Sequence, residues 1–550
     1  MSHIETGSSS PARYRILDLF AGPGGLDVAA DVLGHEVTGI EWDAGACATR
    51  AKAGMDTFKG DVREYRASFF PHAQILTGGP PCQTFTVAGH GAGRRALDQV
   101  LRYIDRLHQA VRETVDAPDA SAAWAQVFRT WRTIHEELRL KEVEARAVKA
   151  EKLDVEQSRA EQRKAMRKRL QELGHTPEAA KAILKQLGEP RDLPFPDQEL
   201  ARLLEEFAER TGRLDKLKDK LEELGDERTG LVLQPLWWII ERSRRPGSMP
   251  FEAVILEQVP AVMPVWDAYT KVLDTLGYRT ATQLLHTEAF GVPQTRRRAV
   301  LMARRDGSDR TPLPLLKQTH ELYHRGRTLA APSAPAHADT LPVDDTGRPL
   351  ARWVSMEQAL ESAGRFSEDV RRRPPFTVVS NYGTGGKPDA RGRRDHDAPS
   401  ATVTGKVSRN RLVHPGTDRD LDDGLARFSH TEAGVLQSFP PAYPWDGNDI
   451  PQQIGNAVPP RLALHVLRHV LEPGLGTEEA EARMDRSIEK LLAWKPRRTV
   501  KPREQKERPC RAVANAAASL VPCPPSRPSP GPPRHSAIAG AAAVALALSW

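Results

Sequence analysis

The chain has 550 residues, which is enough for two or more domains, and its 39% hydrophobic content allows most of it to fold around a core. The net charge of +7 suits a polyanionic partner such as a nucleic acid without requiring one. The 4 cysteines include no CxxC pair and no metal-ligand cluster with histidines. This argues against a disulfide framework, predicts no metal site and favours a reducing compartment, the cytoplasm. The first residues carry no apolar signal core, and the Ala-rich run 537–550 is too short to cross a bilayer comfortably, so we expect no membrane association.

The N-terminal part of the chain alternates between short apolar runs and helical patterns. We expect strands over Tyr14–Phe20, Glu36–Glu41 and Ala73–Leu76, with helices that run to about Leu33 and over Asp43–Gly54. This alternation is typical of an α/β fold.

A glycine-rich loop, DLFAGPGGLDVA (Asp18–Ala29), joins the first strand to the first helix. Such a loop lets a ligand approach backbone amides at a helix N-terminus, although an ordinary tight turn is the alternative. Glu41 ends the next strand about twenty residues on, where a carboxylate can hold two ribose hydroxyls. Trp42 beside it would either stack on an adenine or pack in the core, and Asp61 follows in another loop. The series predicts an adenosine-containing cofactor.

A single cysteine, Cys82, lies in the stretch TGGPPCQTFTVAG directly after the strand Ala73–Leu76. Ligands bind at the carboxyl ends of strands in open α/β sheets, so a thiol on this stiff loop is placed for chemistry. A free cysteine is more often a small buried hydrophobe, and we expect that of Cys47, which lies in a predicted helix.

Residues 99–226 are charge-rich and helical, with almost no strand pattern. Thr176–Gly188 has an N-cap threonine, a proline in the first turn and a terminal glycine, as a short helix does. A heptad pattern, interrupted by Arg210, follows and predicts a coiled coil. We expect an inserted helical arm, for which an antiparallel hairpin is one arrangement; a solvated spacer with no binding role is the alternative. The apolar heptad positions are Leu200, Leu203, Phe207, Leu214, Leu217, Leu221 and Leu224.

The α/β pattern then resumes with a helix from Leu231. Glu257 ends a strongly apolar strand, which places its carboxyl either at the functional edge of the sheet, as a proton donor, or at an ordinary solvated strand end. Arg296 and Arg298 alternate across Arg297 and should therefore point to one face. The polar turn QQIGNAVPP, before the last helix, suits a ligand-contacting loop. The remaining predicted elements are strands over Phe251–Glu257, Tyr278–His286 and Arg298–Ala303 and helices over Ala261–Gly277, Leu425–Gln437 and Pro459–Leu471.

The motifs FAGPGG, GGPPCQ, LEQVP, QTRRRA, LQSFP and QIGNAVPP, in this order, resemble those of the DNA (cytosine-5)-methyltransferase family. The resemblance implies a Rossmann-like S-adenosylmethionine-dependent methyltransferase fold. It also implies a target recognition domain and the methylation of a specific sequence in double-stranded DNA. The boundaries we expect are a catalytic domain over 1–98, 228–304 and 397–475, a helical insertion over 99–227 and a recognition domain over 305–396. The tail over 476–550 should begin with a short charged helix and continue as a basic, proline-rich, disordered segment.

The resemblance assigns roles to individual residues. Cys82 would add to carbon 6 of a flipped-out cytosine, which makes carbon 5 a nucleophile. Glu257 would contact ring nitrogen 3 and the exocyclic amine, while Arg298 and Arg296 would hold the carbonyl oxygen. The positions that match family residues for S-adenosylmethionine are Phe20, Ala21, Gly22, Gly24, Gly25, Leu26, Glu41, Trp42, Asp61, Pro81, Asn456 and Val458.

The sequence also departs from the family pattern. Gln258 stands where the family usually has asparagine after the catalytic glutamate. Gln234 and Pro235 occupy a helix start where the family more often has an aromatic or acidic residue. Three alternatives stay open: an RNA cytosine methyltransferase, a DNA-binding module that has lost catalysis and, on the glycine loop alone, a nicotinamide oxidoreductase. Further expected partners are a cognate restriction endonuclease and a second copy bound through the arm.

Overall fold

The computed structural model describes residues 13–81, 91–186, 197–224, 227–305, 311–324, 349–380, 392–422, 424–472 and 477–504, with the single positions 307, 343 and 347. The predicted nucleophile Cys82 and the apolar run 537–550 lie outside these residues. None of the helices in the described part of the chain has the length and hydropathy needed to cross a membrane.

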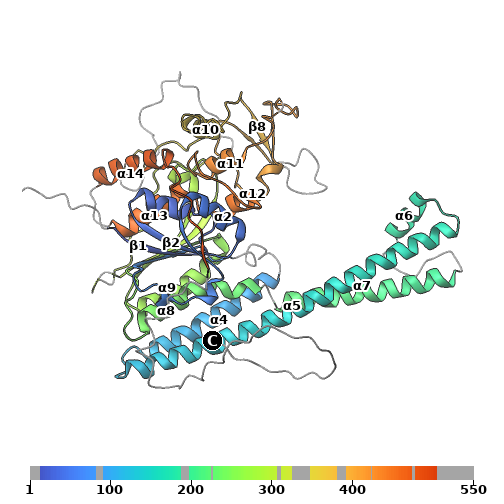
Figure 1. Ribbon diagram of the computed structural model, residues 1–550, viewed down its shortest axis with the longest axis horizontal. Helices are drawn as coiled ribbons and strands as arrows, with labels where there is room; N and C mark the ends of the chain where they lie inside the picture. The colour runs from blue at the N-terminus through green and yellow to red at the C-terminus, as the bar shows by residue number, and fades with distance from the viewer. Residues whose placement is uncertain are drawn as a thin grey trace, which may run out of the picture. The chain divides into compact units, whose positions relative to one another are not determined.

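An eight-stranded sheet forms the centre of the described chain, in the order β11-β3-β2-β1-β4-β5-β7-β6 (Figure 1). The strands from β11 to β5 pair in parallel, and β7 is antiparallel to both of its neighbours. Because β1 pairs with β2 on one side and β4 on the other, the strand order reverses at β1, which is where α/β sheets bind ligands. The strands are β1 Arg15–Leu19, β2 Glu36–Glu41, β3 Asp56–Lys59, β4 Ile75–Gly78, β5 Ala253–Gln258, β6 Arg279–His286, β7 Arg297–Arg304 and β11 Arg503–Glu504.

Helices cover both faces of the sheet, so its central strands read as continuous apolar runs rather than as alternating ones. Successive side chains still point to opposite faces: Leu17 and Leu76 pack with one set of helices, and Ile16 and Ile75 pack with the other. The first set is α4 Gly91–Glu113, α8 Gln234–Arg244 and α9 Met263–Thr275; the second is α1 Gly25–Val32, α13 Pro460–Leu471 and α14 Thr477–Leu492.

Most of the predicted α/β elements are confirmed within a few residues. Asp43 caps α2 Ala44–Ala53 through its side chain, and Gly54 ends that helix in the left-handed conformation. The sequence did not reveal the short strand β3. Part of the predicted turn QQIGNAVPP is helical, because α12 spans Ile450–Asn456.

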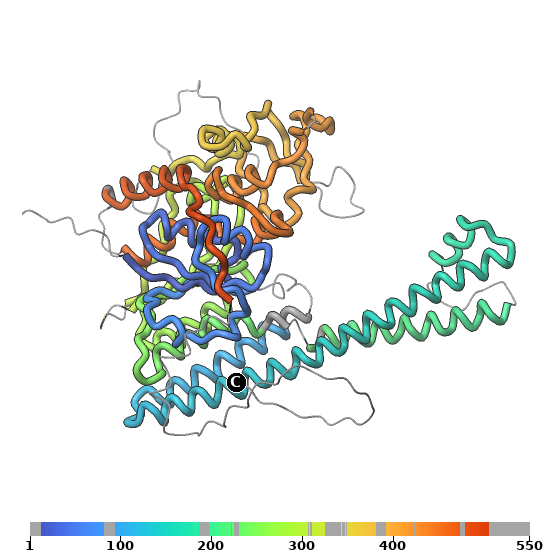
Figure 2. Tube along the Cα trace, viewed as in Figure 1, coloured from blue at the N-terminus to red at the C-terminus, as the bar shows by residue number. Residues whose placement is uncertain are grey.

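The helical arm is the antiparallel hairpin that the sequence predicted. Figure 2 shows the chain running out along α5 Ala120–Glu172 and back along α7 Gln198–Leu224, with α6 Pro177–Gln186 at the turn. The heptad leucines of α7 pack on α5 in two apolar clusters. Arg210, which interrupts the heptad pattern, donates from Nε to Ser158 Oγ across the hairpin at 2.9 Å.

The insertion is nevertheless joined to the catalytic layers. Helix α4 and the start of α5 share the core under the sheet, where Tyr103, Leu107, Val127 and Trp131 are buried. Contacts between α5 and the catalytic layers continue past Ile134, because Leu138 packs against this core and Glu142 pairs with Arg63 at 2.8 Å.

A smaller three-stranded antiparallel sheet, in the order β10-β8-β9, lies in the region predicted for recognition. It extends beyond the expected boundary at 396, because β10 Arg411–Val413 pairs with β8 Thr377–Val379. Strand β9 Arg393–Asp395 completes it, and α10 Met356–Gly364 and α11 His430–Leu436 share its apolar core.

The short charged helix expected at the start of the tail is present as α14 Thr477–Leu492, but residues 493–504 are not disordered as their composition predicted. Leu491 and Trp494, at the end of α14, are buried in the core on the α1 side of the sheet. The chain then adds β11 to the edge of the sheet, where Arg503 pairs with Asp56 at 2.8 Å. Residues 505–550 lie outside the described chain.

Candidate functional site

A cavity of about 580 Å³ opens at the carboxyl ends of the central strands. Its lining includes every predicted cofactor residue except Gly24, and also Glu257, Arg296 and Arg298. Pro81, the last described residue before Cys82, lies at the cavity as well. The described residues predicted from separate motifs therefore meet at one place.

The glycine-rich loop reaches this cavity in a strained conformation. Phe20 has φ 58° and Gly24 has φ 100°, a left-handed value that favours glycine. Gly25 is required by close approach, because a Cβ there would lie 2.0 Å from the carbonyl oxygen of Val458. Helix α1 has no side-chain cap at its N-terminus, so its first backbone amides can bind an anionic group of a ligand.

Glu41 and Trp42 follow at the end of β2. The Glu41 carboxylate accepts hydrogen bonds from the backbone amides of Gly22 at 2.7 Å, Trp42 at 2.9 Å and Asp43 at 2.8 Å. Burial raises the pKa of Glu41, and these bonds oppose that effect. Trp42 is 69% exposed although it lines the cavity, so it is not a core residue and its ring is available for stacking.

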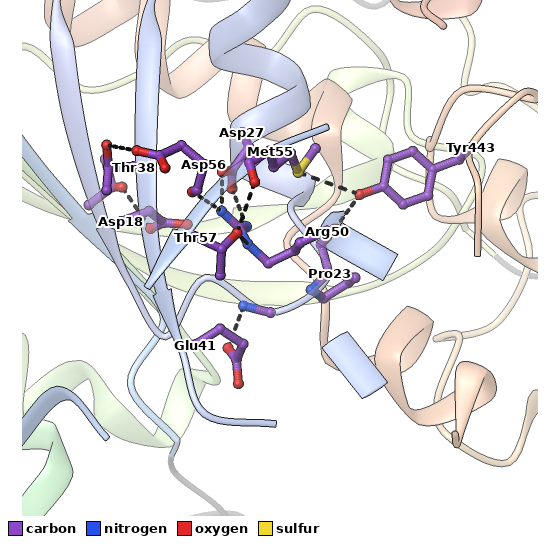
Figure 3. Close-up of polar contacts among 12 residues, drawn as sticks. Asp18, Pro23, Asp27, Thr38, Glu41, Arg50, Met55, Asp56, Thr57 and Tyr443 are labelled. Atoms are coloured by element: carbon purple, nitrogen blue, oxygen red, sulfur yellow. Dashed lines mark hydrogen bonds and ion pairs between the residues drawn. The ribbon is translucent and has the colours of Figure 1, made fainter. Parts of the chain in front are cut away.

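A buried ion pair behind this loop joins α1 to α2, and its arginine also bonds to β3 (Figure 3). The Arg50 guanidinium is fully buried and binds the Asp27 carboxylate through Nη1 at 2.9 Å and Nη2 at 2.6 Å. Its Nε donates to Thr57 Oγ1 at 2.9 Å. Asp18 accepts from Thr77 Oγ1 at 2.7 Å, and burial followed by repulsion from Asp27 raises the pKa of Asp18 to about 8. The sequence analysis did not identify this network.

Cys47 behaves as predicted for a structural cysteine. It is buried, its thiol faces the carbonyl oxygen of Glu41 at 3.4 Å, and burial raises its pKa to about 12. A thiol with so high a pKa is a poor nucleophile near neutral pH.

Asp61 lies at the cavity with its carboxylate already engaged. Arg63 donates to both of its oxygens, at 2.6 Å from Nη2 to Oδ2 and at 3.1 Å from Nε to Oδ1. The backbone amide of Arg63 adds a further bond at 2.9 Å. Asp61 is therefore held in one orientation before any ligand binds.

Glu257 and Arg298 form an ion pair at the other end of the cavity. They come from the antiparallel neighbours β5 and β7, and Arg298 Nε lies 2.6 Å from Glu257 Oε1. The two side chains are only 13% and 12% exposed. Burial lowers the pKa of Arg298, and the Glu257 carboxylate opposes this effect. The pair is a carboxylate and a guanidinium joined by a short charge-assisted contact inside the cavity.

Arg296 lines the same cavity but is used differently. Its Nη1 donates to the carbonyl oxygens of Gly455 at 2.9 Å and Val403 at 3.2 Å. Burial, followed by repulsion from Arg298, lowers the pKa of Arg296 to about 9. The structure thus places Arg298, rather than Arg296, against Glu257, and Arg296 supports the wall of the cavity.

Gln258 connects the end of β5 to the cysteine loop. Its Nε2 donates to the carbonyl oxygen of Pro80, and its Oε1 accepts from the amide of Val259 at 2.6 Å. The longer amide therefore reaches the segment directly before Cys82.

The C-5 cytosine-specific DNA methylase family model matches residues 14–105 and 251–472, which make up more than half of the chain. The chain belongs to this family. Residues 106–250, which contain the hairpin, lie outside the matched segments of the methylase model.

Curated relatives agree with this methylase assignment. The Type II methyltransferase M1.HphI of Haemophilus parahaemolyticus is 29% identical over 210 residues, which cover 37% of this chain and 50% of that protein. The Type II methylase M.HgiDII of Herpetosiphon aurantiacus is 25% identical over 280 residues, 44% of this chain and 70% of that protein. The chain spans about half the length, or less, of several curated relatives it matches. The S. pombe Dnmt2 methyltransferase structure aligns at a TM-score of 0.38 and 13% identity, covering 84% of this chain and 99% of that chain.

Two buried glutamines tie the methylase motifs together, and the sequence analysis quoted their motifs without identifying this function. Gln294, before β7, donates to Gln437 Oε1 and accepts from the amide of Val403 at 2.7 Å. Gln437 donates onward to the carbonyl oxygens of Ile454 at 3.1 Å and Ala457 at 2.8 Å. For Gln437, the apolar neighbours Val435, Leu436 and Phe439 were the available sequence clue; the polar and basic surroundings of Gln294 offered none.

Proposed function

We propose that this chain transfers a methyl group from S-adenosylmethionine to carbon 5 of cytosine in duplex DNA. One observation carries the proposal: the same cavity is lined by Glu41 and Trp42 at one end and by the Glu257–Arg298 pair at the other. Membership of the C-5 cytosine-specific DNA methylase family supports the same reaction.

The residues of the cavity fit the cofactor. A volume of about 580 Å³ is within the range of small-molecule sites. Glu41 has oxygen lone pairs for ribose hydroxyls, the uncapped start of α1 suits a carboxylate, and the exposed Trp42 ring suits an adenine. Bound there, S-adenosylmethionine would supply the electrophilic methyl group that carbon 5 accepts.

The protein groups then account for the chemistry at the base. Carbon 6 of cytosine is a poor electrophile, so the thiolate of Cys82 adds to it and increases electron density at carbon 5. Glu257 contacts ring nitrogen 3 and the exocyclic amine, and Arg298 holds the carbonyl oxygen and stabilises the charge that develops. Once carbon 5 carries the methyl group, a proton acceptor removes the hydrogen from carbon 5. The bond between carbon 6 and the Cys82 sulfur then breaks, and Cys82 is released. The cytosine must leave the helical stack to reach these groups.

The smaller sheet would read the target sequence. The type II names of the relatives support a role in DNA modification, and a cognate endonuclease stays a prediction.

The direct test is methyl transfer from tritiated S-adenosylmethionine to unmethylated genomic DNA, which contains every short recognition sequence. We expect 5-methylcytosine in digested nucleosides from the wild type and from Cys47→Ala, and none from Cys82→Ser. Cys82→Ser should still bind the cofactor. Normal turnover by Cys82→Ser would contradict the covalent mechanism.

A trap tests the adduct itself. In DNA that contains 5-fluorocytosine, fluorine replaces the proton at carbon 5, so elimination fails and the protein should stay covalently attached through Cys82. Transfer to RNA but not to DNA would support the RNA methyltransferase instead. DNA binding without any transfer would support an inactive binding module.

A further inference from the structure

A second cavity, of about 330 Å³, lies where the hairpin meets the cofactor loops. Asp61 lines both this cavity and the larger one, so it stands between them. The wall on the hairpin side comes from α5 and includes Glu142. Arg63 lies between Asp61 and Glu142 and lines the same cavity. The hairpin therefore reaches a residue of the proposed cofactor site.

Two carboxylates share one guanidinium at this contact. Arg63 Nη2 donates to Asp61 Oδ2 at 2.6 Å, and Arg63 Nη1 donates to Glu142 Oε2 at 2.8 Å. Glu142 Oε1 accepts from Arg146 one turn further along α5. Arg63 is thus held at both edges of its guanidinium plane, which fixes the plane's orientation.

The contact is more protected than an ordinary surface ion pair. The side chains of Arg63, Asp61 and Glu142 are 31%, 22% and 14% exposed. Burial disfavours the charge on Arg63, but its bonds to Asp61 and Glu142 outweigh burial and raise its pKa above the ordinary value. Partial removal of water strengthens such charge-assisted bonds relative to exposed pairs.

We propose that Glu142 is a positioning residue for the cofactor: from the hairpin it fixes Arg63, which in turn fixes the carboxylate of Asp61 at the wall of the large cavity. The proposal rests on the proposed function of that cavity. Glu142 lies outside both segments that the methylase family model matches, so the insertion would add this contact to the family's site. The insertion would then be part of cofactor binding rather than a solvated spacer.

The expected consequence concerns binding and not chemistry. Without the charge on Glu142, the Nη1 edge of Arg63 is released, and the guanidinium holds the Asp61 carboxylate less firmly in one orientation. An Asp61 carboxylate held in place is a ready acceptor for an amine of a ligand that lies beside Trp42. Glu257 and Arg298 pair with each other and Glu142 pairs with Arg63 and Arg146, so the rate of the chemical step should not change.

The test compares Glu142→Gln with Glu144→Gln. Glu144 is two residues away on α5 and forms an ion pair with Lys220 at 2.9 Å, but neither side chain contacts Arg63. Calorimetry with S-adenosylhomocysteine should show a Kd raised about three- to tenfold for Glu142→Gln, the range for a protected contact that acts through one intermediary. Glu144→Gln should bind as the wild type does. The KM for S-adenosylmethionine should rise in parallel for Glu142→Gln, with kcat unchanged.

A second variant distinguishes positioning from general stability. If Glu142 acts through Arg63, then Glu142→Gln should have no further effect on Kd in the Arg63→Met background. Independent, additive losses would overturn the proposal, as would an unchanged Kd in Glu142→Gln. A fall in kcat with an unchanged Kd would overturn it too.

These results are separable from a failure of the proposed function. If wild-type protein binds S-adenosylhomocysteine but methylates no nucleic acid, the function is wrong while the Kd comparison still decides the role of Glu142. If the wild type does not bind the compound, the cofactor assignment and the role of Glu142 both fail.

Discussion

Replacing Arg50 with methionine should destabilise the protein strongly, because it leaves the Asp27 carboxylate buried without a partner. The side chain is fully buried, and the change removes two charge-assisted bonds to Asp27 and the bond to Thr57. Breaking a buried pair on one side costs about 3–5 kcal/mol. The shift in melting temperature is the lost free energy divided by the unfolding entropy, which is about 2.1 cal/mol/K per residue. For a folded chain of this length, the melting temperature of the variant should fall by about 3–5 °C.

The assay is thermal unfolding followed by circular dichroism, with Lys52→Met as the matched control. Lys52 lies two residues from Arg50 on α2 and pairs with Asp446 at 3.2 Å, but both side chains are about half exposed, at 51% and 40%. Exposed pairs contribute about 0–1 kcal/mol, so the control should melt within about 1 °C of the wild type. Adding Asp27→Asn to Arg50→Met should restore part of the loss, since no buried charge is then left unpaired. Equal melting of Arg50→Met and the wild type would refute the reasoning.

Three further outcomes are expected. Trp42→Ala should raise the Kd for S-adenosylhomocysteine about three- to tenfold by loss of stacking, and Trp42→Phe should retain most of the affinity; calorimetry that shows no change for Trp42→Ala would contradict the stacking surface. The pKa of Asp18 is raised to about 8, so the folded state keeps a proton that the unfolded chain releases, and this contribution to stability is lost as pH rises from about 4 to about 8. Asp18→Asn should therefore lose less stability than the wild type between pH 6 and pH 8 in urea titrations, and an unchanged pH slope would argue against a protonated Asp18. Gln437→Met should lower the free energy of unfolding by about 2 kcal/mol or more, because the carbonyl oxygens of Ile454 and Ala457 lose a buried donor; a urea midpoint equal to that of the wild type would contradict this.

Local patterns were sufficient to predict most of the fold. Strand β5 begins as the apolar run Ala253–Leu256, and the hairpin follows from the heptads of α7. Strand β3 was not predicted because DTFK is short and half polar, and its position depends on pairing with β2.

The tail was misjudged for a related reason. Its composition is basic and rich in proline, yet Leu491 and Trp494 are buried in the core, and Trp494 also bonds to Asp31 at 2.9 Å. Composition averages over a segment, whereas burial depends on where a few side chains lie.

Motif order predicted the residues of the candidate site but not how each is used. Arg296 donates to backbone carbonyl oxygens, whereas Arg298 pairs with Glu257. This difference depends on Val403 and Gly455, which are distant in sequence but approach the start of β7. The Arg50–Asp27 pair likewise joins two helices, and no spacing rule relates its partners. Contacts of this kind are set by tertiary packing, which a single sequence does not display.

The position of the hairpin in the chain also affects how the protein folds during synthesis. The insertion separates β4 from its neighbour β5, so the edge of β4 stays unpaired until the ribosome has made the whole hairpin. The two long helices of the hairpin form through local contacts and can fold early, and their pairing returns the chain close to where it left the sheet. The entropy of closing the sheet then depends on the distance between the two ends of the hairpin rather than on its full length. A hairpin that folds slowly would prolong the exposure of β4 and favour aggregation of the nascent chain.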